Sequence, residues 1–509
     1  MDQNDEKLNA DLKLVVKSSI IVFLGIFLSK ALTYIYRIII AREFGPEIYG
    51  LFTLALMISG FFIMFSSLGL SDGLLRYMSF YRGKKDMKKA KYLFKTSLLI
   101  SIISGIIFAV LLFFLAEIIA IQIFHNDQLI IFLKFFSIII PLTVVSSILL
   151  SSFLAFEKIF LNSFINNFLQ NFIKVILLIL FLYLNLGVNS IMLSYTISIF
   201  AMLVVAYFLS RKYLPILFYN YKINENMKIT LIKDIFSYSW PLIFVGAVYT
   251  IFGWTDSFVI GYFLDAVQVG FYNVAFTLIS LFGIAPEIFK QIFFPLIMKE
   301  YSNKNKDRIK ELSKQVAKWI FVINLPLFIF IFIFPGAFLN IIFGAQYLVA
   351  ENTLRILAIG GLLTSLGTLL SNLLSMKGKT KIILINLIVV SLIDLLMNII
   401  LVPKYGINGA ALSTIFNMAL LNILLFIEVK YYTSIIPLRR KMLSIFLASI
   451  IPLICLTLIR SYISPTLLNI ILLGIFFIFI YIILLFLFRC LDSHDLIVLK
   501  SIKNKLLKR

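Results

Sequence analysis

Three basic residues lie within long apolar stretches of this sequence: Lys30, Arg37 and Lys174. On a helix, a spacing of seven places Lys30 and Arg37 on the same face. A charge at the centre of an apolar span is unfavourable by about 3 kcal/mol, so such a residue usually serves a binding site or a transport pathway. Arginine offers paired planar donors and lysine a point charge, which suits a diphosphate or an acidic sugar. Alternatively, these cations pair with acidic groups and only hold helices together.

A run of amide side chains precedes Lys174. Its members recur every three or four residues and so form one broad polar helix face: Asn162, Asn166, Asn167, Gln170 and Asn171. Such groups can bond sugar hydroxyls. The alternative is hydrogen bonding between neighbouring helices, worth about 0.6 kcal/mol per contact. The candidate substrate-binding residues are Lys30, Arg37, Asn166, Gln170 and Lys174.

The charges within apolar stretches change sign in the second half of the chain. Asp256 lies in one stretch, Asp394 and Asn398 lie in another, and Thr414 follows in a third. Oxygen ligands of this kind suit a small cation or a proton. These four residues are therefore candidates for ion or proton coupling, with ion pairing to the basic residues of the first half as the alternative.

The sequence offers little for catalysis or for a resident metal. His125 and His494 are far apart, and Cys455 and Cys490 lie in or beside apolar stretches without a zinc-ligand spacing. The net charge of +22 comes with no nucleic-acid-binding motif. We therefore expect no enzyme activity, no cofactor other than a coupling sodium ion or proton, and no nucleic-acid partner.

The composition requires a membrane. Of the 509 residues, 61% are hydrophobic and 14% charged, and the mean hydropathy is +1.04. A membrane-spanning helix needs about 20 apolar residues. Fourteen such stretches occur, at about 14–40, 47–70, 92–116, 128–156, 159–184, 188–209, 236–262, 267–297, 315–340, 352–376, 380–402, 407–430, 441–460 and 466–489. The predicted fold is an all-α polytopic membrane protein.

The charges of the connecting loops predict the orientation, because cytoplasmic loops are rich in Lys and Arg. Basic residues gather in alternate loops, at 71–91, 211–235, 298–314, 377–381 and 430–441, and in the tail. The opposite side offers little beyond Arg42, Lys404 and Arg460. We therefore predict a cell-membrane protein with both termini in the cytoplasm.

An internal repeat divides the chain. YGLFTLAL from Tyr49 aligns with VGFYNVAF from Val269, and LLSSFLAF from Leu149 with LLSNLLSM from Leu369, both at an offset of 220 residues. Two pseudo-symmetric six-helix lobes with the same orientation are expected around a central cavity. The predicted domains are an N-terminal lobe (1–210), a cytoplasmic linker (211–235), a C-terminal lobe (236–430), an extra helix pair (441–489) and a basic cytoplasmic tail (490–509).

Three segments suggest a family. YRIIIAREFGPEIYGLFTLAL at 36–56, WTDSFVIGYFLDAVQVGFYNVAF at 254–276 and YGINGAALST at 405–414 resemble the polysaccharide flippases of the multidrug/oligosaccharidyl-lipid/polysaccharide exporter superfamily. The resemblance implies an alternating-access flippase that moves lipid-linked oligosaccharide to the outer leaflet, with membrane lipids around it and as a monomer. Some relatives bind sodium through acidic, amide and hydroxyl groups that Asp256, Asp394, Asn398 and Thr414 resemble.

Other functions stay open. A lipid-linked peptidoglycan precursor is an alternative substrate. A drug exporter of the same superfamily would need an acidic, aromatic-lined cavity, and the cations at Lys30, Arg37 and Lys174 argue against it. A membrane glycosyltransferase is disfavoured because the predicted external loops are short.

Overall fold

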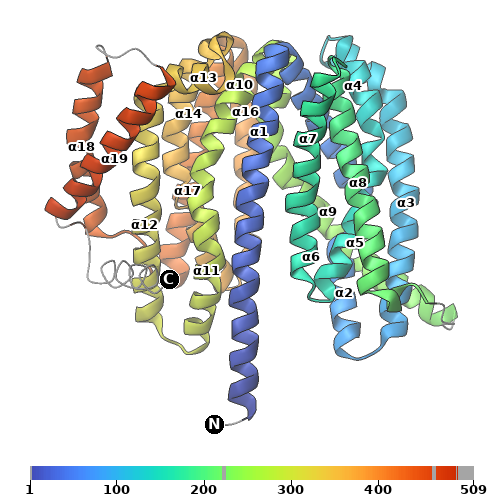
Figure 1. Cartoon of the computed structure of the whole chain (residues 1–509). Helices are drawn as coiled ribbons and strands as arrows, with labels where there is room; N and C mark the ends of the chain where they lie inside the picture. Colours follow the sequence, from blue (N-terminus) through green and yellow to red (C-terminus); the bar gives the residue numbers. More distant parts are fainter. Residues whose placement is uncertain (1–2, 220–224, 461–465, 489, 491–509) are drawn as a thin grey trace. The chain divides into compact units, whose positions relative to one another are not determined.

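The computed structural model describes residues 3–219, 225–460, 466–488 and 490. These residues form helices joined by turns, without a strand (Figure 1). The predicted tail 490–509, with His494, lies outside the described residues except for position 490. The α-helices are α1 (Gln3–Ser67), α2 (Leu70–Gly83), α3 (Met87–Ile118), α4 (Gln128–Ser137), α5 (Ile139–Ala155), α6 (Ile159–Ser163), α7 (Gln170–Tyr183), α8 (Asn189–Tyr213), α9 (Glu225–Phe263), α10 (Ala266–Ile279), α11 (Ile284–Ser302), α12 (Lys306–Ile333), α13 (Pro335–Phe343), α14 (Glu351–Thr364), α15 (Gly367–Met376), α16 (Thr380–Tyr405), α17 (Ile407–Thr433), α18 (Arg440–Arg460) and α19 (Leu467–Leu487).

Five short helices of other types interrupt or join these α-helices. Two have the wider π geometry, η1 (Ile119–Ile123) and η2 (Phe164–Leu169). The other three are 3-10 turns, η3 (Pro215–Leu217), η4 (Ser280–Gly283) and η5 (Ala345–Ala350). Because η2 lies between α6 and α7, the polar face predicted there is not a regular α-helical stripe.

Thirteen helical stretches of the described chain are long and apolar enough to cross a membrane. The first, Phe27–Gly83, overlaps two predicted spans, at 14–40 and 47–70, and each other stretch overlaps one. The prediction of an all-α polytopic membrane protein is therefore confirmed. The arrangement of two lobes around a central cavity, and the domain boundaries drawn from the repeat, stay predictions.

The first stretch is two helices rather than one. Within α1, Gly45 has φ 78° and ψ 180°, and Pro46 follows it. Glycine accepts positive φ without strain, and proline suits the first turn of the next helix because it lacks an N–H donor. The break has a counterpart 220 positions later, at Asp265 between α9 and α10. There the Asp265 carboxylate accepts a bond from the Gln268 N–H at 2.7 Å.

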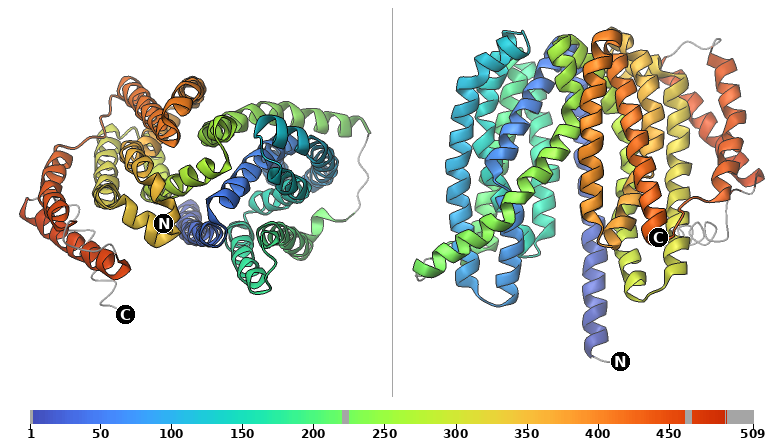
Figure 2. Two further views of the ribbon diagram at one scale, coloured as in Figure 1. Left: turned by 90° about the horizontal axis from the view of Figure 1, so that it is seen from above. Right: turned by 180° about the vertical axis from the view of Figure 1, so that it is seen from behind.

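The chain groups into two compact units. The first unit contains the residues up to Asn273 together with Leu387–Ala410, and the second contains Val274–Asn386 and the chain from Ala411. In the first unit, α7 packs on α8, α5 on α3 and α8, and α1 on α3, α5 and α7. The view from above in Figure 2 shows the cyan and green helices of this unit side by side with the blue α1.

Helices from the two halves of the repeat cross closely within the first unit. A Cβ atom added at Gly50 would lie 1.7 Å from the Ala266 carbonyl oxygen. One added at Gly270 would lie 2.1 Å from the Pro46 carbonyl oxygen. Gly50 and Gly270 are themselves 220 positions apart. The crossing is therefore reciprocal, and each backbone approaches the other where a side chain is missing.

The second unit has a continuous apolar core. α12 packs against α18 and α19, and the cluster includes Leu325, Ile445 and Phe477. The Tyr481 hydroxyl also donates to the Val322 carbonyl oxygen at 3.3 Å. The predicted extra helix pair is thus packed on α12 by side-chain burial, and Figure 1 shows it in red beside that helix.

Candidate functional site

Two carboxylates are linked by hydrogen bonds in the first unit. The Asn398 amide of α16 donates to Asp256 Oδ1 at 2.9 Å and to Asp394 Oδ1 at 3.1 Å. The Tyr272 hydroxyl of α10 donates to Asp256 Oδ2 at 2.5 Å. We call Asp256, Tyr272, Asp394 and Asn398 the acidic cluster. Asp256, Asp394 and Asn398 are three of the four residues predicted for ion or proton coupling, and the structure brings these three together.

Burial makes the acidic cluster electrostatically sensitive. Asp394 is 4% exposed and Asn398 fully buried, whereas Asp256 is half-buried. Two carboxylates that share one amide donor repel each other when both are ionised. Repulsion between them is reduced when one carboxyl group takes up a proton or when a cation lies beside both.

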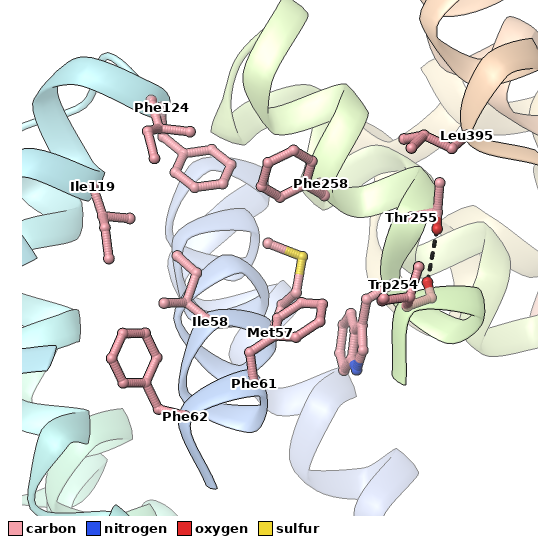
Figure 3. A pocket seen from close by; sticks show the side chains of 12 residues that line it. Met57, Ile58, Phe61, Phe62, Ile119, Phe124, Trp254, Thr255, Phe258 and Leu395 are labelled. Atoms are coloured by element: carbon pink, nitrogen blue, oxygen red, sulfur yellow. Dashed lines mark hydrogen bonds between the residues drawn. The ribbon is translucent and has the colours of Figure 1, made fainter. Parts of the chain in front are cut away.

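An apolar cavity adjoins the acidic cluster. It has a volume of about 300 Å³ and is walled largely by side chains of α1 and α9 (Figure 3). Two of its lining residues, Thr255 and Leu395, are the chain neighbours of Asp256 and Asp394. Thr255 donates its hydroxyl to the Ile251 carbonyl of its own helix at 2.7 Å. The lining of the cavity is thus largely apolar, and it contains no carboxylate among the described residues.

The candidate cation Lys174 is buried in the first unit, with 5% exposure. Its Nζ donates to Asn171 Oδ1 at 2.8 Å. The same atom lies 5.0 Å from the ring centroid of Tyr36 and 5.3 Å from that of Tyr195. Cation–π contacts of this kind contribute about 2 kcal/mol when water is excluded. We call Tyr36, Asn171, Lys174 and Tyr195 the lysine cage.

The lysine cage is fixed to its neighbours by further hydrogen bonds. Asn171 Nδ2 donates to Ser29 Oγ at 3.0 Å, and Thr33 Oγ1 donates to Asn171 Oδ1 at 3.2 Å. The Tyr36 hydroxyl lies 3.1 Å from Ser194 Oγ of α8. These bonds join α7 and α8 to one face of α1. They hold the ammonium group in place without an acidic partner.

The ion-pair alternative is not realised for two of the three cations. Among the residues that the structure describes, neither Lys174 nor Lys30 forms an ion pair. Lys30 is half-buried on α1. Arg37 is also half-buried, and its Nη1 donates to the Tyr49 hydroxyl at 3.5 Å. The charge that acts on Lys174 is a second cation, Arg37.

The amide face divides into bonded and available side chains. Asn162 donates to the Leu150 carbonyl oxygen at 3.1 Å, and Asn171 belongs to the lysine cage. The side chains of these two residues therefore form hydrogen bonds between helices, which was the alternative to sugar binding. Asn166 in η2 is exposed, and Gln170 at the start of α7 is half-buried. Both of these candidates can still reach a ligand.

One candidate belongs to the other unit, and the structure adds residues that the sequence reasoning missed. Thr414 on α17 is 7% exposed and belongs to the second unit, whereas the residues of the acidic cluster belong to the first. The missed residues are Tyr36, Tyr195 and Tyr272. The repeat could have indicated one of them, because Tyr36 lies 220 positions before the candidate residue Asp256 and therefore occupies the equivalent position in the first half.

The comparisons with known proteins place these features in a family. The family model described as "Polysaccharide biosynthesis protein" matches residues 39–352. A membrane protein of Methanocaldococcus jannaschii is 25% identical over 505 residues, which is 96% of this chain and 97% of that protein. A protein of Haloferax volcanii named "Probable low-salt glycan biosynthesis flippase Agl15" is 23% identical over 221 residues, covering 43% of this chain and 46% of that one.

A solved structure shares the fold. It is that of "Lipid II flippase MurJ" in an inward closed conformation, with a TM-score of 0.73 and 20% sequence identity. The match covers 92% of this chain and 99% of that one. The resemblance drawn from the sequence is confirmed by these matches, as is the description of a multi-pass membrane protein.

Proposed function

Because this chain belongs to the polysaccharide biosynthesis protein family, we propose that it is an alternating-access flippase for a lipid-diphosphate-linked oligosaccharide. The lipid would move from the inner to the outer leaflet of the cell membrane for polysaccharide or surface-glycan synthesis. The observation that carries the proposal is Lys174, a buried cation without an ion pair among the described residues. A diphosphate entering a cavity loses water and needs several donors in its place.

The residues of the first half supply those donors. Lys174, Arg37 and Lys30 would contact the diphosphate, while Asn166 and Gln170 would bond sugar hydroxyls. A neutral or cationic cargo would gain nothing from the three cations, which disfavours a drug exporter. The relatives support a transporter, because the matched names include two flippases.

The experiment is a turnover assay in vesicles that contain the purified protein and a fluorescent lipid-diphosphate oligosaccharide. Arg37→Ala should abolish turnover, and Arg37→Lys should retain part of it because the charge survives while the paired geometry is lost. Lys134→Ala is the matched control, since Lys134 lies on α4 with its Nζ 5.4 Å from the Phe113 ring, outside the lysine cage. Wild-type turnover in both Arg37→Ala and Lys30→Ala would contradict the proposal and reopen the drug exporter.

A second candidate cargo is a lipid-linked peptidoglycan precursor. The fold match to a lipid II flippase favours it, and the cations would serve its diphosphate equally well. The same vesicles distinguish the two when both lipids are offered together. Preferential turnover of the peptidoglycan precursor would favour this second cargo.

The acidic cluster would couple transport to an ion. We expect Asp256 and Asp394 to bind sodium or a proton with Asn398, and Thr414 to add a hydroxyl ligand when the helices rearrange. The residues present fit a small cation, because carboxylate, amide and phenol oxygens gather at one place.

The proposed orientation places both termini and the 71–91 loop in the cytoplasm, with the protein as a monomer. Cysteine labelling tests the orientation at Lys85, an exposed position between α2 and α3. An impermeant thiol reagent should not label Lys85→Cys in intact cells. Labelling from outside would reverse the topology.

A further inference from the structure

A basic pocket lies at one end of the second unit, apart from both clusters described above. It has a volume of about 520 Å³ and is lined by the first turns of α12 and by the segment between α17 and α18. Among its described lining residues there is no acidic side chain. The five cations that line it are Lys310, Lys314, Arg439, Arg440 and Lys441.

The local sequence explains the shape of this basic pocket. α17 ends at Thr433, whose Oγ1 accepts a bond from the Ile435 N–H at 3.1 Å. Ser434 then has φ 56°, which turns the chain away from the helix axis. The chain runs without helix until α18 begins at Arg440. The positive end of the α18 dipole therefore adds to the positive potential of the pocket.

One carboxylate lies near two of these cations. Glu311 lies 3.7 Å from Lys314 Nζ and 4.0 Å from Arg439 Nη2. Arg439 also donates to the Gln315 side chain, which fixes its position at the pocket wall. Lys310 and Arg440 are exposed and form no ion pair with any described residue. The pocket therefore keeps an excess of positive charge and attracts an anion.

Apolar side chains beside the cations indicate what kind of anion fits. Ile436 and Leu438 line the same pocket and are 40% and 46% exposed. A soluble phosphate would gain nothing from them, whereas a lipid offers acyl chains beside its phosphate. Lys310 and Arg440 belong to the loops 298–314 and 430–441, whose charges predict one and the same side of the membrane. The predicted orientation therefore puts the pocket beside the headgroups of one leaflet.

From these observations, we propose that the basic pocket binds the phosphate headgroup of an anionic membrane phospholipid. The cations contact the phosphate oxygens, and Ile436 and Leu438 contact the first carbons of the acyl chains. None of the lining residues of the pocket is among the residues proposed for transport. Lipid binding would make the stability of the second unit depend on the lipid composition of the membrane, because a ligand that binds the folded state stabilises it.

The test is native mass spectrometry of the full-length purified protein, titrated with phosphatidylglycerol or phosphatidylcholine. Wild-type protein should retain phosphatidylglycerol in preference to phosphatidylcholine. The triple variant Lys310→Gln, Arg440→Gln, Lys441→Gln should bind phosphatidylglycerol about a hundredfold more weakly, at about fivefold for each charge removed. The matched control is Lys84→Gln, Lys85→Gln, Lys88→Gln, which removes the same charge from the 71–91 loop and should leave the affinity unchanged.

Three other results would overturn the proposal. Equal loss in the control would mean attraction by overall charge rather than by this pocket. Displacement of the lipid by millimolar inorganic phosphate would assign the pocket to a free anion. Preferential binding of a polyprenyl diphosphate would assign it to the transported lipid. If the triple variant fails to fold, the single variant Arg440→Gln answers the question, because that side chain is exposed, and an unchanged affinity there would contradict the proposal.

Discussion

The lysine cage and the acidic cluster occupy equivalent positions in the two halves of the repeat. Lys174 corresponds to Asp394 and Tyr36 to Asp256, each pair separated by 220 positions. At the same offset, Phe52 corresponds to Tyr272 and Leu178 to Asn398. In the first half an ammonium group lies against aromatic rings, and in the second half an amide joins two carboxylates. Two positions of each cluster are thus equivalent, and at the Lys174–Asp394 pair the sign of the charge is reversed.

The difference suggests why the two sites would have different tasks. The lysine cage carries its own cation, so it is ready to receive an anion. The acidic cluster has carboxylates where the first half has a tyrosine and a lysine, so its proposed role is to take a cation or a proton from solution. A duplicated helical frame can therefore hold opposite charges, because it fixes backbone positions and leaves the side chains free to differ.

The largest effect is expected from breaking the crossing that joins the two halves. Gly50→Ala places a Cβ atom 1.7 Å from a backbone oxygen, so the helices must move apart. We expect a loss of about 1–3 kcal/mol of stability or more. Thermal melting followed by size-exclusion chromatography measures it.

The control for this variant lies on the same helix. A Cβ atom at Gly60 meets nothing within 4 Å. Gly60→Ala should therefore leave stability unchanged or raise it by about 0.5–1 kcal/mol through helix propensity. Equal melting temperatures for Gly50→Ala and wild type would show that the crossing tolerates a side chain.

The next largest effect is expected from a variant of the lysine cage that changes transport without lowering stability. Lys174→Met keeps the length of the side chain and removes the charge. Turnover of a lipid-diphosphate oligosaccharide should fall about 10- to 100-fold, which corresponds to the loss of a charge-assisted hydrogen bond. The melting temperature should stay the same or rise, because a buried charge no longer has to be desolvated. A marked fall in melting temperature would instead make Lys174 a structural residue.

In the acidic cluster, Asp394→Asn keeps the shape and removes one charge. Turnover should fall about tenfold, because the variant loses a charged contact to the bound cation, and its dependence on sodium or pH should disappear. Ser391→Ala is the matched control, since the Ser391 hydroxyl only bonds the Leu387 carbonyl of its own helix at 2.6 Å. Unchanged sodium and pH dependence in both Asp394→Asn and Asp256→Asn would end the coupling proposal.

The smallest effect is expected from a variant that makes the second half of the repeat more like the first. Tyr272→Phe gives the second half the residue that the first half has at Phe52. The lost hydroxyl donates to Asp256 at 2.5 Å, so we expect the cation concentration for half-maximal turnover to rise about fivefold. Tyr481→Phe removes a buried hydroxyl that bonds the Val322 carbonyl oxygen and should not change that concentration. An equal change in both variants would argue against a specific role of Tyr272.

The membrane spans and the repeat could be predicted from the sequence because they depend on local composition and on alignment of the chain with itself. The grouping of Asp256, Asp394 and Asn398 as oxygen ligands was predicted from their residue types within apolar stretches, and the hydrogen bonds of Asn398 join them. The rings of Tyr36 and Tyr195 around Lys174 could not be predicted, because they come from helices far apart in the chain. The α-helical spacing behind the predicted amide face is interrupted by the π-helical turn η2, and sugar binding by this face stays a prediction.

The reciprocal approach of Gly50 and Gly270 bears on how such a chain could have originated. A contact in which each half offers the same bare backbone to the other has the form of a two-fold symmetric dimer interface. A single six-helix ancestor could have paired with a second copy through the position of Gly50 before its gene was duplicated and fused. It follows that residues 1–210, produced alone in a membrane, should self-associate through Gly50, and that Gly50→Ala should keep this half monomeric.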